Sequence, residues 1–103
     1  MILKFKNLVD NHFRSEKQVK FYAASLSVSP NQLNQSTQLV AGKSAKALIS
    51  ERVLREAKIQ LHYNDEDIAQ ISYQLGFEEP THFVRFFRRY EGITPGAYRQ
   101  LRM

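Results

Sequence analysis

Hydrophobic residues recur along most of the chain at the three- and four-residue spacing of amphipathic helices. In the clearest case, which begins at Pro80, the apolar face consists of Phe83, Phe86, Phe87 and Tyr90. The opposite face is polar and basic and consists of Thr81, His82, Arg85, Arg88 and Arg89. Because proline suits the first helical turn and glycine the position after the last, a helix is predicted from Pro80 to just before Gly92.

The segment in front of this helix predicts a shorter helix over residues 67–74 and a tight turn through Gly76 and Phe77. A short helix, a turn that contains glycine and a second helix with a basic outer face form a helix-turn-helix pattern. Such a pattern places the second helix in the major groove of DNA.

The outer face of the helix that begins at Pro80 carries the chemistry that DNA reading needs. Arg85 offers two parallel donors to guanine, and Thr81 and His82 lie in the N-terminal half, from which side chains reach base edges. Arg88 and Arg89 lie further on, where phosphates are the expected partners. Helical patterning alone is equally consistent with a surface helix whose arginines are solvated.

The rest of the chain also predicts helices, because runs of alternating β-branched residues are missing. Each of the three prolines follows a residue in the position of a helix cap, namely Ser29, Glu79 and Thr94. We predict an all-α fold of about seven helices, at about residues 3–13, 17–25, 30–40, 45–62, 67–74, 80–91 and 95–101. The predicted core is Phe5, Leu8, Val9, Phe13, Val19, Tyr22, Ala23, Leu26, Leu33, Ser36, Thr37, Val40, Leu48, Ile49, Val53, Ala57, Leu61, Ile68, Ala69, Ile71, Ser72, Leu75, Phe83, Phe86, Phe87, Tyr90, Ala97, Tyr98 and Leu101.

The helix-turn-helix pattern occurs a second time, nearer the N-terminus. The outer face of its second helix consists of Asn31, Gln32, Asn34, Gln35 and Gln38. We therefore predict helix-turn-helix subdomains over residues 1–43 and 63–103, joined by a linker helix over residues 44–62. At ~1.5 Å per residue that linker is roughly 25–28 Å long. With the width of the flanking helices added, this length suits two reading helices in major grooves about 34 Å apart.

Charge and composition favour nucleic acid as a partner. The formal net charge is +5. Residues 63–80 hold five acids and no base, whereas residues 81–103 hold five arginines and one acid. The chain has no cysteine, which excludes disulfides and thiolate metal sites and suits a cytoplasmic location. No apolar run approaches the length of a membrane span, so no membrane association is expected.

Neither an enzyme nor a metal protein is indicated. The histidines His12, His62 and His82 fall on three different predicted helices, without the spacing of paired metal ligands. The glycine-containing turns are not phosphate-binding loops. We therefore expect no catalytic residues, no metal and no cofactor.

The order of these residues along the chain resembles that of the DNA-binding domain of AraC/XylS-type bacterial transcription regulators, over about residues 17–101. The C-terminal signature reads DIAQIS from Asp67, LGF from Leu75, HF from His82, RFF from Arg85 and GITP from Gly92, followed by Tyr98-Arg99. The linker resembles that family at Arg52, Leu54, Glu56, Ala57, Lys58 and Leu61, and the first subdomain at Tyr22, Ala23, Leu26, Val28, Ser29, Leu33, Gly42, Lys43 and Ser44.

The resemblance implies a seven-helix domain that binds double-stranded DNA through both reading helices and regulates transcription. By position, the residues that face bases are Asn31, Gln32, Asn34 and Gln35 in the first helix and Thr81, His82 and Arg85 in the second. Contacts to the DNA backbone fall to Gln38, Lys43, Ser44, Arg88 and Arg89. RNA polymerase and a preceding sensing or dimerisation domain are further candidate partners.

One segment departs from the family pattern. Residues 29–42 contain no charged side chain, and Ser36 and Thr37 take inward positions. Without charge this helix gains nothing from counterion release, although Asn and Gln still read adenine. We therefore expect the second helix-turn-helix to dominate DNA binding. The competing hypothesis is a helix-turn-helix module used for protein docking, through the uncharged helix and an exposed Leu39.

Overall fold

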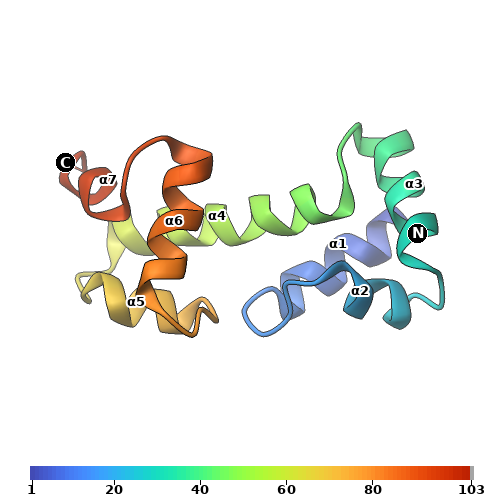
Figure 1. Ribbon diagram of the computed structural model, residues 1–103, viewed down its shortest axis with the longest axis horizontal. Coiled ribbons are helices and arrows are strands. Elements are labelled where there is room, and N and C mark those ends of the chain that lie inside the picture. The colour runs from blue at the N-terminus through green and yellow to red at the C-terminus, as the bar shows by residue number, and fades with distance from the viewer. Residues whose placement is uncertain (103) are drawn as a thin grey trace. The chain divides into compact units, whose positions relative to one another are not determined.

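The computed structural model describes residues 1–102, which form seven α-helices and no strand. The helices, shown in Figure 1, are α1 (Ile2–His12), α2 (Val19–Ser25), α3 (Pro30–Ala41), α4 (Ala45–Tyr63), α5 (Ile68–Gln74), α6 (Pro80–Glu91) and α7 (Pro95–Gln100). The chain divides within α4 into unit 1, residues 1–53, and unit 2, from residue 54 onward. The prediction of an all-α fold of about seven helices is confirmed.

The two units have the same order of helical segments. Unit 1 runs from α1 through α2 and α3 into the first half of α4, and unit 2 runs from the second half of α4 through α5 and α6 to α7. In each unit the second and third of these segments form a helix-turn-helix, which is α2 and α3 in unit 1 and α5 and α6 in unit 2. The internal repeat that the sequence indicates is therefore present in the fold.

The turn of each helix-turn-helix is built in the same way. The backbone N–H of Val28 donates to the Ala23 carbonyl over 3.0 Å, and that of Phe77 donates to the Ser72 carbonyl over the same distance. Both turns pass through the left-handed region, with φ of 58° at Ser27 and 88° at Gly76. A glycine adopts this conformation without strain, whereas Ser27 adopts it at a cost, so the second turn has the better-suited residue.

The helices that follow these turns, α3 and α6, match closely. Each has twelve residues, begins at a proline and ends before a left-handed glycine, Gly42 or Gly92. Their N-caps differ. Ser29 forms a full capping box with Gln32, whereas Glu79 makes no side-chain hydrogen bond to its helix. Ser29 is therefore the stronger cap of the two.

The predicted core is largely confirmed, and its buried members come from α1 to α6 and the residues next to them. Four apolar predictions are wrong, because Val40, Tyr90, Ala97 and Leu101 are exposed. Val40 and Tyr90 lie in the last turns of twelve-residue helices, and α2 and α5 have only seven residues each. Val40 and Tyr90 are 63% and 45% exposed, so the apolar stripe of each helix is not buried in its last turn.

Large and small core side chains change places between the units. Thr37 on α3 is fully buried and takes the position that Phe87 takes on α6. The hydroxyl of Thr37 donates to the Asn34 carbonyl over 3.0 Å, so no polar group is left unpaired there. Conversely, Phe13, which follows the last residue of α1, is buried in unit 1, and the smaller Leu61 on α4 is buried in unit 2. The buried phenylalanines of unit 1 thus lie in α1 or directly after it, and those of unit 2 lie in α6.

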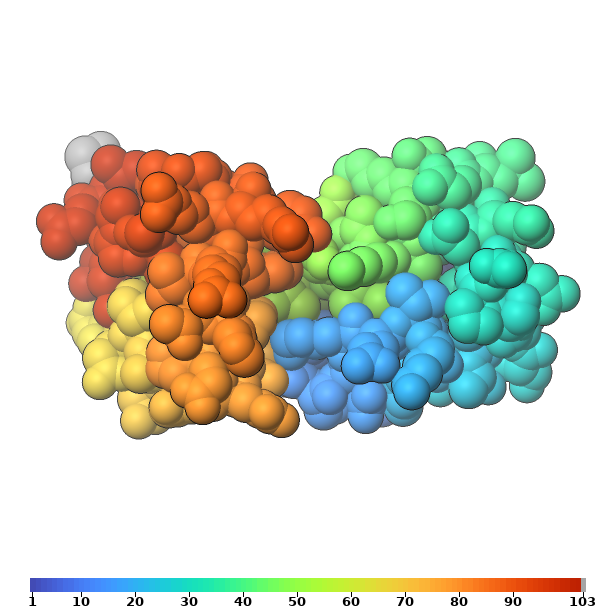
Figure 2. All heavy atoms as spheres, in the orientation of Figure 1, coloured from blue at the N-terminus to red at the C-terminus, as the bar shows by residue number. Residues whose placement is uncertain are grey.

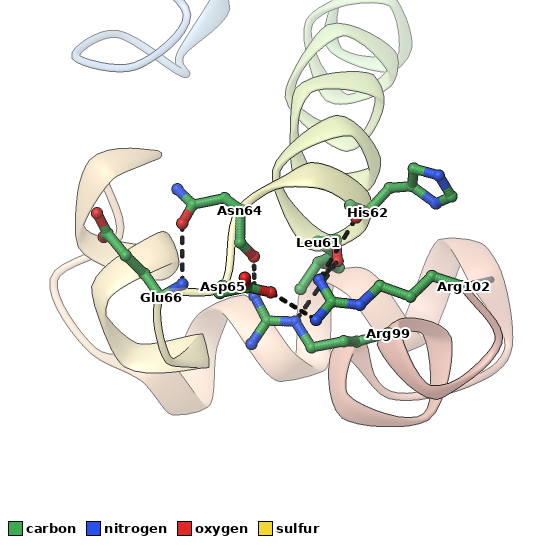
Figure 3. A network of polar contacts seen from close by, with 7 residues as sticks. All are labelled: Leu61, His62, Asn64, Asp65, Glu66, Arg99 and Arg102. Atoms are coloured by element: carbon green, nitrogen blue, oxygen red, sulfur yellow. Dashed lines mark hydrogen bonds and ion pairs between the residues drawn. The ribbon is translucent and has the colours of Figure 1, made fainter.

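In unit 2 two arginines hold α7 against the end of α4 (Figure 3). The Arg99 guanidinium donates over 2.8 Å to the Asn64 carbonyl, and that of Arg102 donates to the carbonyls of Leu61 and His62 over 3.3 and 3.4 Å. The last carbonyls of a helix have no partner within the helix and favour cations. Both arginines are therefore committed to the fold.

In unit 1 the buried hydroxyl of Tyr22 leads us to expect that the domain loses stability at high pH. Its hydroxyl donates to the Glu16 carbonyl over 2.6 Å. Burial, helped by the charge of Glu16, raises the pKa of Tyr22 to about 12. An unfolded tyrosine ionises near pH 10, so this stability is complete below pH 10 and is lost between about pH 10 and 12.

We expect the free energy of unfolding to fall by about 1–3 kcal/mol across that pH range because of Tyr22. Urea titrations at pH 9, 10 and 11 measure the fall. Tyr22→Phe is the control, because it cannot ionise and its stability is expected to change less over the same range. Equal pH dependence of the two proteins would show that Tyr22 is not the group responsible.

Candidate nucleic-acid interface

The polar face of α6 is exposed, as predicted. Thr81, His82, Arg85, Arg88 and Arg89 all lie at the surface, and α6 is visible in orange on the face drawn in Figure 2. None of these five side chains makes a hydrogen bond or ion pair within residues 1–102. They are therefore available to an outside partner without the loss of an internal contact.

The opposite side of α6 anchors the helix in unit 2. Phe83 and Phe87 are fully buried, and the Phe87 ring lies 5.4 Å from that of Tyr98 on α7. Glu91, the last residue of α6, forms an ion pair of 2.6 Å with Lys58 on α4. A carboxylate at a helix C-terminus is unfavourable alone, and Lys58 offsets that cost. The exposed polar face is thus presented by a helix that is held at several points.

Phe86 is not the core residue that the apolar stripe predicts. It is partly exposed, between the Phe77 ring at 5.5 Å and the Tyr90 ring at 5.1 Å. Its position at the edge of the stripe places one side of the ring against unit 2 and leaves the other at the surface.

The predicted outer face of α3 is partly exposed and partly used within unit 1. Asn31, Gln32, Gln35 and Gln38 are exposed. Asn34 is half-buried, because its side-chain oxygen accepts a hydrogen bond of 3.0 Å from the Ala45 N–H, so its assignment to the outer face is corrected. Gln32 also has an internal contact, with its side-chain oxygen on the Ser29 N–H.

The repeat assigns each outer residue of α3 a counterpart on α6. The exposed-to-buried order of residues 31–45 is the same as that of residues 81–95. The paired outer positions are Asn31 and Thr81, Gln32 and His82, Gln35 and Arg85, Gln38 and Arg88, and Leu39 and Arg89. Unit 1 therefore presents amides and one apolar side chain where unit 2 presents three arginines.

The predicted backbone contacts after α3 have roles of their own. Ser44 caps α4, with its hydroxyl oxygen accepting from the Ala47 N–H over 3.0 Å. Lys43 is exposed and forms an ion pair with Glu51. Lys46, which we did not predict as a contact, is exposed in the first turn of α4. Its charge beside the predicted Ser44 cap was the signal that could have singled it out.

Residues 1–102 contain no group of three or more potential metal-ligating side chains. Within the same range, no helix has both the length and the hydropathy required to cross a membrane.

Comparison with known proteins identifies the class. A family model described as a helix-turn-helix domain matches residues 22–101. The chain belongs to this family, and it is an AraC-type helix-turn-helix DNA-binding domain of the kind found in bacterial transcription regulators. The family is one of DNA-binding domains and not of enzymes.

A curated relative is the HTH-type transcriptional regulator YtdP of Bacillus subtilis, 32% identical over 94% of this chain and 14% of the relative. The chain spans 32% and 30% of the lengths of two other relatives. Among solved structures, the C-terminal domain of the response regulator AraT from Geobacillus stearothermophilus has the same fold, with a TM-score of 0.92, 23% identity and coverage of 99% of this chain and 85% of that one. The DNA-binding domain of AdpA, solved with a target DNA, has a TM-score of 0.82 and 21% identity, and covers 94% of this chain and 90% of its own.

Proposed function

We propose that this domain binds double-stranded DNA sequence-specifically, with α6 as the dominant reading helix. The observation that carries the proposal is the exposed face of α6, whose polar and basic side chains make no hydrogen bond or ion pair with the described residues, 1–102. Within that face, Arg85 would read guanine, and Thr81 and His82 would approach neighbouring bases. Arg88 and Arg89 would bind phosphate oxygens, which position the helix without reading sequence.

In the same proposal α3 enters a second, successive major groove and contributes less affinity. Asn31, Gln32 and Gln35 would read bases there, because Asn and Gln pair well with adenine. Asn34 would contribute less than expected from its position, since its oxygen is already bound to Ala45. Gln38, Lys43 and Ser44 are the proposed backbone contacts. The nineteen residues of α4 support the spacing, because they correspond to roughly 28 Å of helix.

Salt dependence and site selection test the proposal together. We expect the logarithm of the affinity for duplex DNA to fall linearly with the logarithm of salt concentration, with a slope of about −0.9 per neutralised phosphate. Selection from random duplexes is expected to enrich two blocks about one helical turn apart, the better defined of them set by α6. Binding that is independent of sequence would contradict the reading role.

A docking function has one observation in its favour. On α3, Leu39 is 87% exposed and Val40 is 63% exposed, and the segment is uncharged. Leu39→Ser separates the two functions. Two results together would favour docking. The variant would bind DNA as the parent does, and it would lose a protein complex that is insensitive to salt. RNA polymerase and a sensing or dimerisation domain stay predicted partners of the whole regulator, because the curated relatives are several times longer than this chain.

A further inference from the structure

The ion pairs beside the two reading helices are arranged in opposite ways. In unit 2 the acid lies on the reading helix itself, where Glu91 is paired with Lys58. The arginines of α6 have no partner among the residues that the structure describes. In unit 1 the base lies next to the reading helix, where Lys43 follows α3 by two residues and is paired with Glu51. In unit 1 the reading helix thus carries no charge, and Lys43, one of the cations nearest to it, is already paired with Glu51.

We propose that Glu51 competes with DNA phosphate for Lys43 and thereby lowers the affinity of unit 1 for the DNA backbone. The proposal rests on the proposed function, because it needs Lys43 to face a phosphate. Lys43 lies between Gly42, which ends α3, and Ser44, which caps α4. The Asn34–Ala45 hydrogen bond ties the first residue of α4 to the middle of α3 and so keeps Lys43 beside the reading helix.

The exposure of the pair makes the competition reversible. The side chains of Lys43 and Glu51 are 52% and 48% exposed. Exposed ion pairs contribute little to stability and are screened by salt, so a phosphate in reach can displace the carboxylate. Until it does, Glu51 both occupies the ammonium group of Lys43 and repels the incoming phosphate. Lys46, exposed one turn along, is not part of this pair.

A double-mutant cycle tests the proposal. The four proteins are the parent, Glu51→Gln, Lys43→Gln and the double variant, and the probe is a mixed-sequence duplex of about three helical turns. We expect Glu51→Gln to tighten binding about two- to fivefold at low salt. We also expect it to steepen the salt slope toward one further phosphate. In the Lys43→Gln background the same substitution is expected to have a smaller effect, because the cation that it would release is gone.

Three outcomes would overturn the proposal. Binding by Glu51→Gln that is equal to or weaker than the parent's would show that the carboxylate does not compete. An equal gain in both backgrounds would show general charge repulsion and not competition for Lys43. If either of these two results were found while Arg85→Ala still weakened binding, the inference about Glu51 would fail and the proposed function would stand. Failure of the parent to bind any duplex would remove the proposed function as well. Unchanged melting temperatures establish that all four proteins are folded.

Discussion

Replacing Phe87 with alanine is expected to destabilise unit 2 by about 3–5 kcal/mol. The ring is fully buried and contacts Phe83 and Tyr98, so its loss leaves a cavity where α6 meets α7. A small domain has a total stability of about 5–15 kcal/mol, so much of the population would unfold. Thermal melting followed by circular dichroism measures the effect.

Phe86→Ala is the matched control, because it removes the same side chain from the neighbouring position of the same helix. Phe86 is partly exposed, so its loss is expected to cost only about 1–2 kcal/mol. Equal destabilisation by the two substitutions would contradict the burial difference between the rings. Hydrogen exchange at the backbone amides of α5 and α6 would show whether the Phe87→Ala effect is confined to unit 2.

Replacing Arg85 with alanine is expected to weaken binding to the selected duplex by about 1–3 kcal/mol, or roughly 5- to 150-fold. The side chain is exposed at the middle of the polar face of α6 and has no hydrogen-bond or ion-pair partner within residues 1–102. Its removal should therefore leave the fold intact and relax the preference at one base pair. Gel shifts on a series of single-base variants of the duplex measure both effects.

Arg85→Lys separates charge from geometry at the same position. Lysine keeps the positive charge but lacks the planar fork that pairs with guanine O6 and N7. We expect it to restore much of the salt-dependent affinity and little of the base preference. Full preference in Arg85→Ala would remove Arg85 from the base-reading residues.

The helices and the exposed polar face of α6 could be predicted because they depend on local signals. Proline at the first turn and glycine after the last mark α3 and α6, and helical spacing separates Phe83 from Arg85. Spacing gives the direction of a side chain but not the depth of its burial. Val40 and Tyr90 therefore share the spacing of the buried residues and are nevertheless exposed.

The features that could not be predicted depend on contacts between residues that are distant in the sequence. Asn34 has the spacing of an outer residue, but its oxygen bonds to the backbone of Ala45, eleven positions away. The Lys43–Glu51 pair spans the start of α4, and no periodicity in the sequence indicates it. Arg99 forms part of the family signature, and only the fold shows that its guanidinium binds the carbonyl of Asn64.

The shared helix α4 makes the two units interdependent in folding. Its first half buries Ile49 in unit 1, and its second half buries Ala57 and Leu61 in unit 2. Isolated helices shorter than ~12–15 residues are marginal in water, and neither half of α4 exceeds that length. Loss of either unit would leave its half of α4 without packing and free to fray toward the other. We therefore expect denaturation of one unit to be transmitted to the other along the backbone of α4.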